Sequence, residues 1–128
     1  MTESYQTEDA DYIIITLGSI SGLVREVVDA IRKEGRRVGL LRLRYLRPFP
    51  NKEIADAVKN AKAVAVLEKD ISFGNEGTVY TNVNSALQKA NIRITSSDYI
   101  GGLGGRNISK EEIKIIFDEL EQQQSMVK

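Results

Sequence analysis

Two short apolar runs constrain the fold of this chain more than any other feature. They are Tyr12–Leu17 (YIIITL) and Ala63–Leu67 (AVAVL), and both are apolar almost throughout. A strand that is apolar on both faces needs cover from both sides, as it has in the centre of a parallel sheet. Each run is followed along the chain by apolar residues at helical spacing. Strands and helices are therefore expected to alternate.

The remaining elements follow from the same periodicities and from local stop signals. The first helical face, whose last apolar residue is Ile31, is ended by Gly35 just past Glu34. A capping box of Ser109 and Glu112 opens the last helix. The other expected elements are a strand at Val38–Leu43, a helix from an Asn51 cap to about Ala61, a helix at Val79–Ala90 and a strand at Ile92–Thr95.

These elements predict a doubly covered α/β sheet. The first and third strands are the most apolar, so they should be central, which gives the spatial order second, first, third, fourth. We expect one domain at residues 1–121 and a frayed polar tail at residues 122–128.

Composition excludes several classes of function. Lys and Arg total 18, as do Asp and Glu, so no basic excess points to nucleic acid or to an anionic membrane. No apolar run approaches the ~20 residues that span a bilayer, and a cytoplasmic location is the default expectation. The chain has no cysteine and no histidine, so it lacks thiolate chemistry, cluster ligands and the usual general base.

Two glycine-containing segments follow predicted strands and so belong to the carboxyl edge of the sheet. One is Ile71–Gly77 (ISFGNEG), preceded by Glu68 and Asp70, and the other is Gly101–Arg106 (GGLGGR). Open α/β sheets bind ligands at this edge. Glu68 with Asp70 could hold a metal or act as acid and base, or they could form a charged rim. The glycines allow a bent connection or close approach to a ligand or protein surface.

Two further groups of residues admit two interpretations each. Gly18–Gly22 (GSISG) opens the first helix, where anions bind, but it lacks a phosphate-loop spacing and also fits a tight turn. A cluster of arginines indicates either a docking surface for an acidic partner or phosphate, or an edge strand blunted by charge. Its members are Arg36, Arg37, Arg42, Arg44 and Arg47.

Several motifs, taken in order, resemble one known family. They include Leu17-Gly-Ser, Gly35-x-x-Val-Gly-Leu-Leu-Arg-Leu-Arg, Arg47-Pro-Phe-Pro, Ile71-Ser-Phe-Gly-x-Glu-Gly and Gly101-Gly-Leu-Gly-Gly-Arg. The chain is similar, from about Tyr5 to Leu120, to the second domain of the α subunit of pyruvate and related 2-oxoacid:ferredoxin oxidoreductases. The resemblance implies a fold like the transketolase C-terminal domain. That fold is a three-layer α/β/α unit with a mixed five-stranded sheet of order 1-3-2-4-5 and an antiparallel first strand, here around Ser4–Thr7.

The resemblance also implies a function for the whole complex. The family oxidatively decarboxylates a 2-oxoacid with thiamine diphosphate and Mg, passes electrons through iron–sulfur clusters to ferredoxin, and forms acyl-coenzyme A. This chain lacks the thiamine signature and any cysteine, so we expect no cofactor on it and no activity from it alone. Its expected partners are the thiamine-binding domain of the α subunit, the other subunits and, through the complex, ferredoxin.

We therefore expect a structural and assembly domain whose contacts with partner domains lie on the two glycine-containing segments. The predicted interface residues are Asp70, Phe73, Gly74, Glu76, Gly77, Gly101, Gly102, Gly104, Gly105 and Arg106. One alternative is a free-standing module that binds a phosphate or nucleotide between the ends of the two central strands. Another, a phospho-acceptor regulator, lacks an acidic residue where the first strand ends at Leu17 and Gly18.

Overall fold

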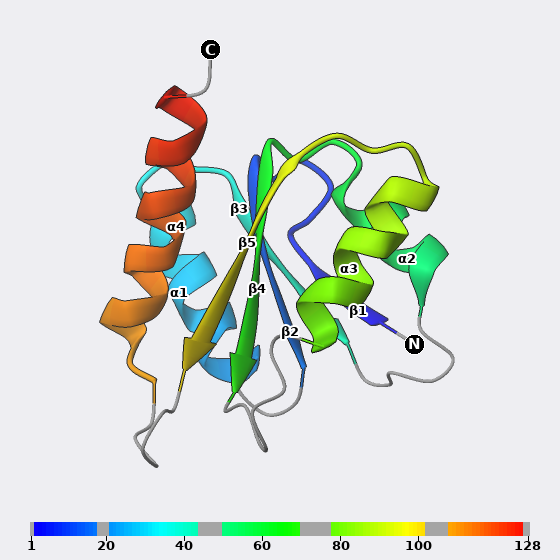
Figure 1. Ribbon diagram of the computed structural model, residues 1–128. Helices are drawn as coiled ribbons and strands as arrows, with labels where there is room; N and C mark the ends of the chain where they lie inside the picture. Colours follow the sequence, from blue (N-terminus) through cyan, green and yellow to red (C-terminus); the bar gives the residue numbers. More distant parts are fainter. Residues whose placement is uncertain (1, 18–20, 44–49, 70–77, 102–107, 127–128) are drawn as a thin grey trace.

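A computed structural model of the chain describes residues 2–17, 21–43, 50–69, 78–101 and 108–126 (Figure 1). Within these ranges, five strands form one sheet: β1 (Thr2–Tyr5), β2 (Tyr12–Leu17), β3 (Val38–Leu43), β4 (Ala63–Lys69) and β5 (Thr95–Gly101). The described helices are α1 (Ser21–Lys33), α2 (Asn51–Val58), α3 (Thr78–Lys89) and α4 (Lys110–Met126).

The sheet has the order β1-β3-β2-β4-β5, which confirms both the predicted order and the transketolase-like arrangement. Strands β3, β2, β4 and β5 run parallel, and β1 pairs antiparallel with β3. The added strand is Thr2–Tyr5 rather than Ser4–Thr7. It ends at Tyr5 because Gln6 takes a φ of 58° and the chain turns there.

Two apolar clusters fill the space between the sheet and its helices. On one face, α1 and α4 pack over alternate residues of the central strands, such as Ile14 and Ala65. On the other face, α2 and α3 cover the intervening residues, such as Ile15 and Val64 (Figure 1). Ile13, Ile14 and Ile15 are completely buried. The apolar character of β2 on both faces therefore reflects a central, doubly covered strand, as predicted.

The predicted fourth strand at Ile92–Thr95 was wrong, because β5 lies at Thr95–Gly101 and shares only Thr95 with it. Ile92 belongs to the end of α3, where Asn91 takes a φ of 60° and the Ile92 N–H donates to the Leu87 carbonyl at 2.9 Å. A left-handed residue with this hydrogen bond and an apolar contact is a common helix ending. Ile92 and Ile94 pack against the α2–α3 cluster.

The ends of three helices can be compared with the ends predicted from the sequence. Gly35 ends α1 with a φ of 87°, as predicted. The predicted Asn51 cap was wrong: Pro50 occupies the N-cap position, Asn51 is the first helical residue, and no side chain caps α2, which ends at Val58. Helix α4 runs to Met126, so residues 122–126 of the predicted tail are helical.

Among the described residues, no helix is long and apolar enough to cross a membrane.

Candidate functional site

The carboxyl edge of the sheet is where β2, β4 and β5 all end, and their arrows point the same way in Figure 1. Most of the predicted interface residues follow these strand ends directly in the chain. Asp70, Phe73, Gly74, Glu76 and Gly77 lie outside the described residues, as do Gly102, Gly104, Gly105 and Arg106. Gly101 is described. It is the last residue of β5 and pairs with Lys69, so it belongs to the strand and not to the loop.

Two side-chain contacts tie helix α4 to β5. The Tyr99 hydroxyl donates to the Glu119 carboxylate at 2.7 Å, and the Ser97 hydroxyl lies 3.2 Å from the Gln123 side-chain oxygen. Burial, followed by the hydrogen bond to Glu119, raises the pKa of Tyr99 well above its ordinary value. Tyr99 therefore remains a neutral donor at physiological pH, and β5 is tied to α4 through side chains.

The start of α4 confirms the predicted capping box. The Glu112 N–H donates to the Ser109 hydroxyl at 3.1 Å, and the Ser109 N–H donates to the Glu112 carboxylate at 2.9 Å. Ile108, just before the cap, packs on the cluster that contains Ile113. These contacts fix the point at which the segment after β5 re-enters the fold.

Glu68 lies near the end of β4, where a catalytic or metal role was considered. Its Oε1 accepts a hydrogen bond from the Val79 N–H in the first turn of α3 at 3.4 Å. Its Oε2 is buried with no hydrogen-bond partner among the described residues. The described ranges contain no group of three or more metal-ligating side chains. In this structure Glu68 therefore faces the first turn of α3, where a negative charge is favourable.

The three described members of the predicted arginine cluster lie toward opposite ends of β3. Arg36, before β3, pairs with Asp118 of α4 at 2.9 Å, and Arg37 pairs with Asp11 at 3.3 Å. Arg42 lies near the opposite end of β3 and pairs with Glu3 of β1 at 3.2 Å. Arg44 and Arg47 lie outside the described residues. Arg36 and Arg37 thus join elements at the amino edge, and of these three only Arg42 lies near the carboxyl end of β3.

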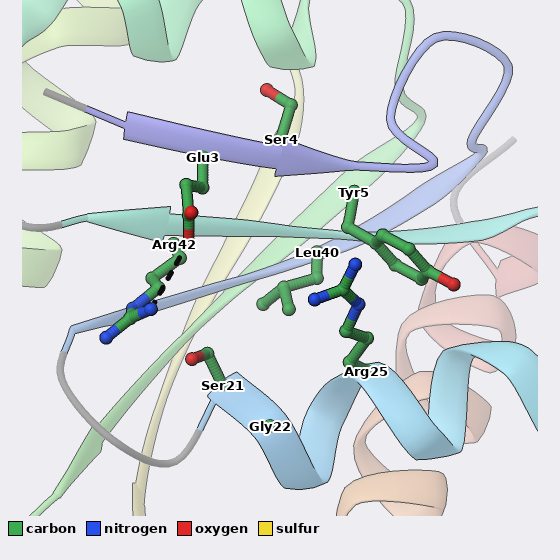
Figure 2. Close-up of a pocket in the computed structure, with 8 residues that line it drawn as sticks. All are labelled: Glu3, Ser4, Tyr5, Ser21, Gly22, Arg25, Leu40 and Arg42. Carbon is green, nitrogen blue, oxygen red and sulfur yellow. Dashed lines mark hydrogen bonds and ion pairs between the residues drawn. The ribbon is translucent and has the colours of Figure 1, made fainter.

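A pocket of about 550 Å³ lies between the β1–β3 pair and the start of α1 (Figure 2). Buried Leu40 lies between its two ends, and Ser21 and Gly22 contribute the first residues of α1. Arg42 flanks the pocket at one end and Arg25 at the other, with the Arg25 guanidinium 4.3 Å from the centre of the Tyr5 ring. Sequence reasoning identified Arg42 but missed Arg25, whose place depends on β1.

Comparison with known families shows where the chain belongs. The sequence model of the family described as "Pyruvate:ferredoxin oxidoreductase core domain II" matches residues 10–113. The chain belongs to this family. The resemblance noted in the sequence is thus confirmed over most of the chain.

Curated relatives agree with this core domain II assignment, and a solved structure shares the fold. Ketoisovalerate oxidoreductase subunit VorA of Pyrococcus horikoshii is 40% identical over 120 residues, covering 94% of this chain and 30% of VorA. Pyruvate synthase subunit PorA of Methanosarcina barkeri is 42% identical over 120 residues, covering 93% of this chain and 30% of PorA. A 2-oxoglutarate:ferredoxin oxidoreductase structure from Magnetococcus marinus shares the fold, with a TM-score of 0.70 and 24% identity over 94% of this chain and 20% of that one.

This core domain II chain spans about 30% of the length of the curated relatives that it matches. Both relatives are named as subunits of larger enzymes, one for ketoisovalerate and one for pyruvate. Their identities to this chain differ by only two percentage points (42 against 40), so overall identity does not distinguish the two substrates.

Proposed function

We propose that this chain is the assembly domain of the α subunit of a 2-oxoacid:ferredoxin oxidoreductase. The whole enzyme would decarboxylate a 2-oxoacid, with pyruvate as the first candidate, to acyl-coenzyme A and reduce ferredoxin. The observation that carries the proposal is the core domain II match over residues 10–113, together with relatives named as enzyme subunits.

The chemistry of the chain favours a supporting role over a catalytic one. Its sequence holds no cysteine to ligate an iron–sulfur cluster and no histidine to act as a general base. Thiamine diphosphate, Mg, iron–sulfur clusters and coenzyme A would therefore be bound by other parts of the complex. A cytoplasmic location, in a compartment that keeps thiols reduced, is part of the same proposal.

The segments at 70–77 and 101–106 are proposed as the contacts with the thiamine-binding domain and the other subunits. The support is their position in the chain, since each follows a parallel strand that ends at the carboxyl edge. The helix that follows each segment has a fixed start. Glu68 accepts a hydrogen bond from the first turn of α3, and the Ser109–Glu112 capping box opens α4. A rigid frame around such segments would present them to a partner in a defined geometry.

Assembly is tested by mixing the chain with the remaining subunits and domains of the oxidoreductase. Size-exclusion chromatography with light scattering should show the chain in one stoichiometric complex with them. A chain that elutes alone at micromolar concentration, although its circular dichroism shows it folded, would refute the assembly role.

A further inference from the structure

The pocket between β1, β3 and α1 carries an excess of positive charge. Arg42 is paired with Glu3, which is the one carboxylate among the residues that line the pocket. Arg25 contacts the Tyr5 ring, and none of the ion pairs found within the described residues includes Arg25. The Asp29 carboxylate, one turn further along α1, accepts a hydrogen bond from the Tyr5 hydroxyl. The first turn of α1 contains no acidic residue that would compensate for it. The two guanidiniums and one carboxylate thus leave one positive charge facing the pocket.

The size and lining of the pocket suit an organic molecule better than a simple ion. Its volume of about 550 Å³ falls within the roughly 300–1,000 Å³ that is usual for small-ligand sites. In Figure 2 the Leu40 side chain lies between the two guanidiniums, and the Tyr5 ring lies beside the guanidinium of Arg25. An anionic group at a guanidinium, with an apolar body over Leu40, fits this lining.

We propose that this pocket binds a small organic oxyanion, a molecule that bears a phosphate or carboxylate group beside an apolar body. The anionic group lies between Arg25 and the start of α1, within reach of Arg42. The site is distinct from the ends of β2 and β4, where a ligand was considered from the sequence. The proposal does not depend on the assembly role, because anion binding is measured on this chain alone.

Protection of a sheet edge by charged side chains does not explain the positions of Arg25 and Arg42. An edge is protected by charges on the edge strand itself, whereas Arg25 belongs to α1 and Arg42 to β3, which is covered by β1. The guanidiniums flank a shared cavity instead of the free edge.

The test is a titration of the 128-residue chain followed by ¹H–¹⁵N NMR at constant ionic strength. Phenyl phosphate and benzoate are the two probes, and neutral benzyl alcohol is the reference for the apolar body. At least one anion should give saturable shifts at the Ser21 and Gly22 amides and at the Nε–H groups of Arg25 and Arg42. The tighter of the two anions identifies phosphate or carboxylate as the preferred group.

Three variants locate the binding. Arg25→Gln removes the uncompensated charge, and Gly22→Leu fills the pocket from a position where an added Cβ meets nothing within 4 Å. Each should weaken anion binding at least fivefold. Arg37→Gln removes the same charge from the opposite edge, where Arg37 pairs with Asp11, and should change the affinity less than twofold.

Three results would overturn the proposal. They are shifts that never saturate, equal weakening in Arg25→Gln and Arg37→Gln, and binding of benzyl alcohol as tight as that of the anions. Dispersed spectra of each variant show that the chain remains folded, which separates lost binding from lost structure.

Discussion

A Cβ atom added at Gly39 would lie 2.6 Å from the main-chain carbonyl oxygen of Gln6. Gly39 lies in β3, and Gln6 begins the connection from β1 to β2, so the missing side chain lets this connection pack on the sheet. Real Cβ atoms do not approach a backbone oxygen so closely. The glycine at position 39 is therefore required by packing between two parts of the backbone.

Gly39→Ala should accordingly destabilise the chain by about 1–3 kcal/mol, the usual cost of overpacking. The matched control is Gly22→Ala, where an added Cβ meets nothing within 4 Å. Because alanine favours the helix, the control should leave stability unchanged or raise it by up to about 1 kcal/mol. Urea unfolding followed by circular dichroism measures both changes. Equal stabilities for the two variants would contradict the packing of Gln6 on Gly39.

Ser109→Ala removes one half of the capping box at the start of α4. The Glu112 N–H then loses its acceptor, and the expected loss is about 1 kcal/mol in the free energy of unfolding. Ser109→Asp keeps an acceptor and should retain most of the stability. If alanine and aspartate proved equally stable at this position, the hydrogen bond would not be contributing to the helix start.

Asp9 should titrate below the ordinary aspartate value of 3.8. The hydrogen bond from Arg32, with further electrostatic attraction by the same guanidinium, lowers the pKa of Asp9. Since the folded pKa lies below the unfolded one, this contact stabilises the fold above about pH 3.8 and is lost as pH falls through the folded pKa. NMR titration of the Asp9 carboxyl carbon measures the shift.

Arg32→Gln should return the pKa of Asp9 to its ordinary range. Arg32 also donates to the carbonyls of Gln6 and Val38, both at 2.8 Å, so this variant should lose stability at neutral pH as well. Asp9→Asn is the control that removes the carboxyl but keeps these two bonds. An Asp9 pKa that is the same in the Arg32→Gln variant and in the unaltered chain would show that another group causes the shift.

Gly104→Val tests the proposed contact through the second glycine-containing segment. The variant should impair assembly with the partner subunits more than it changes the melting temperature of the chain alone. If Gly104 has a positive φ, valine should also lower the free energy of unfolding of the chain alone, by about 1 kcal/mol or more. Calorimetry of the chain and size-exclusion chromatography of the complex separate the two effects. Equal losses in both measurements would assign the loop a purely structural role.

The sequence predicted the centre of the sheet better than its edges. Strands β2 and β3 match their predicted bounds because their apolar runs are also their buried positions. Strand β5 was misplaced because Ser96, Ser97 and Asp98 carry no strand signal of their own. This segment is a strand because β4 pairs with it and α4 binds it through Tyr99 and Ser97. Such tertiary contacts override local propensity.

The candidate pocket was beyond sequence reasoning for a similar reason. Arg25 lies on the exposed side of α1, and no motif around it in the sequence indicates a binding site. It meets Tyr5 only because β1 adds to the edge of β3 in the antiparallel direction, with Tyr5 paired to Leu40. The capping box, in contrast, could be predicted in full, because its two side chains are three residues apart in one helix turn.

Ferredoxin reduction tests most directly the proposal that this chain supports an oxidoreductase without performing its chemistry. The assay contains pyruvate, coenzyme A and thiamine diphosphate, and it is run with the chain alone, with the partner subunits alone and with both together. We expect reduction only when both are present. Reduction by the chain alone, or full activity of the partners without it, would contradict the account.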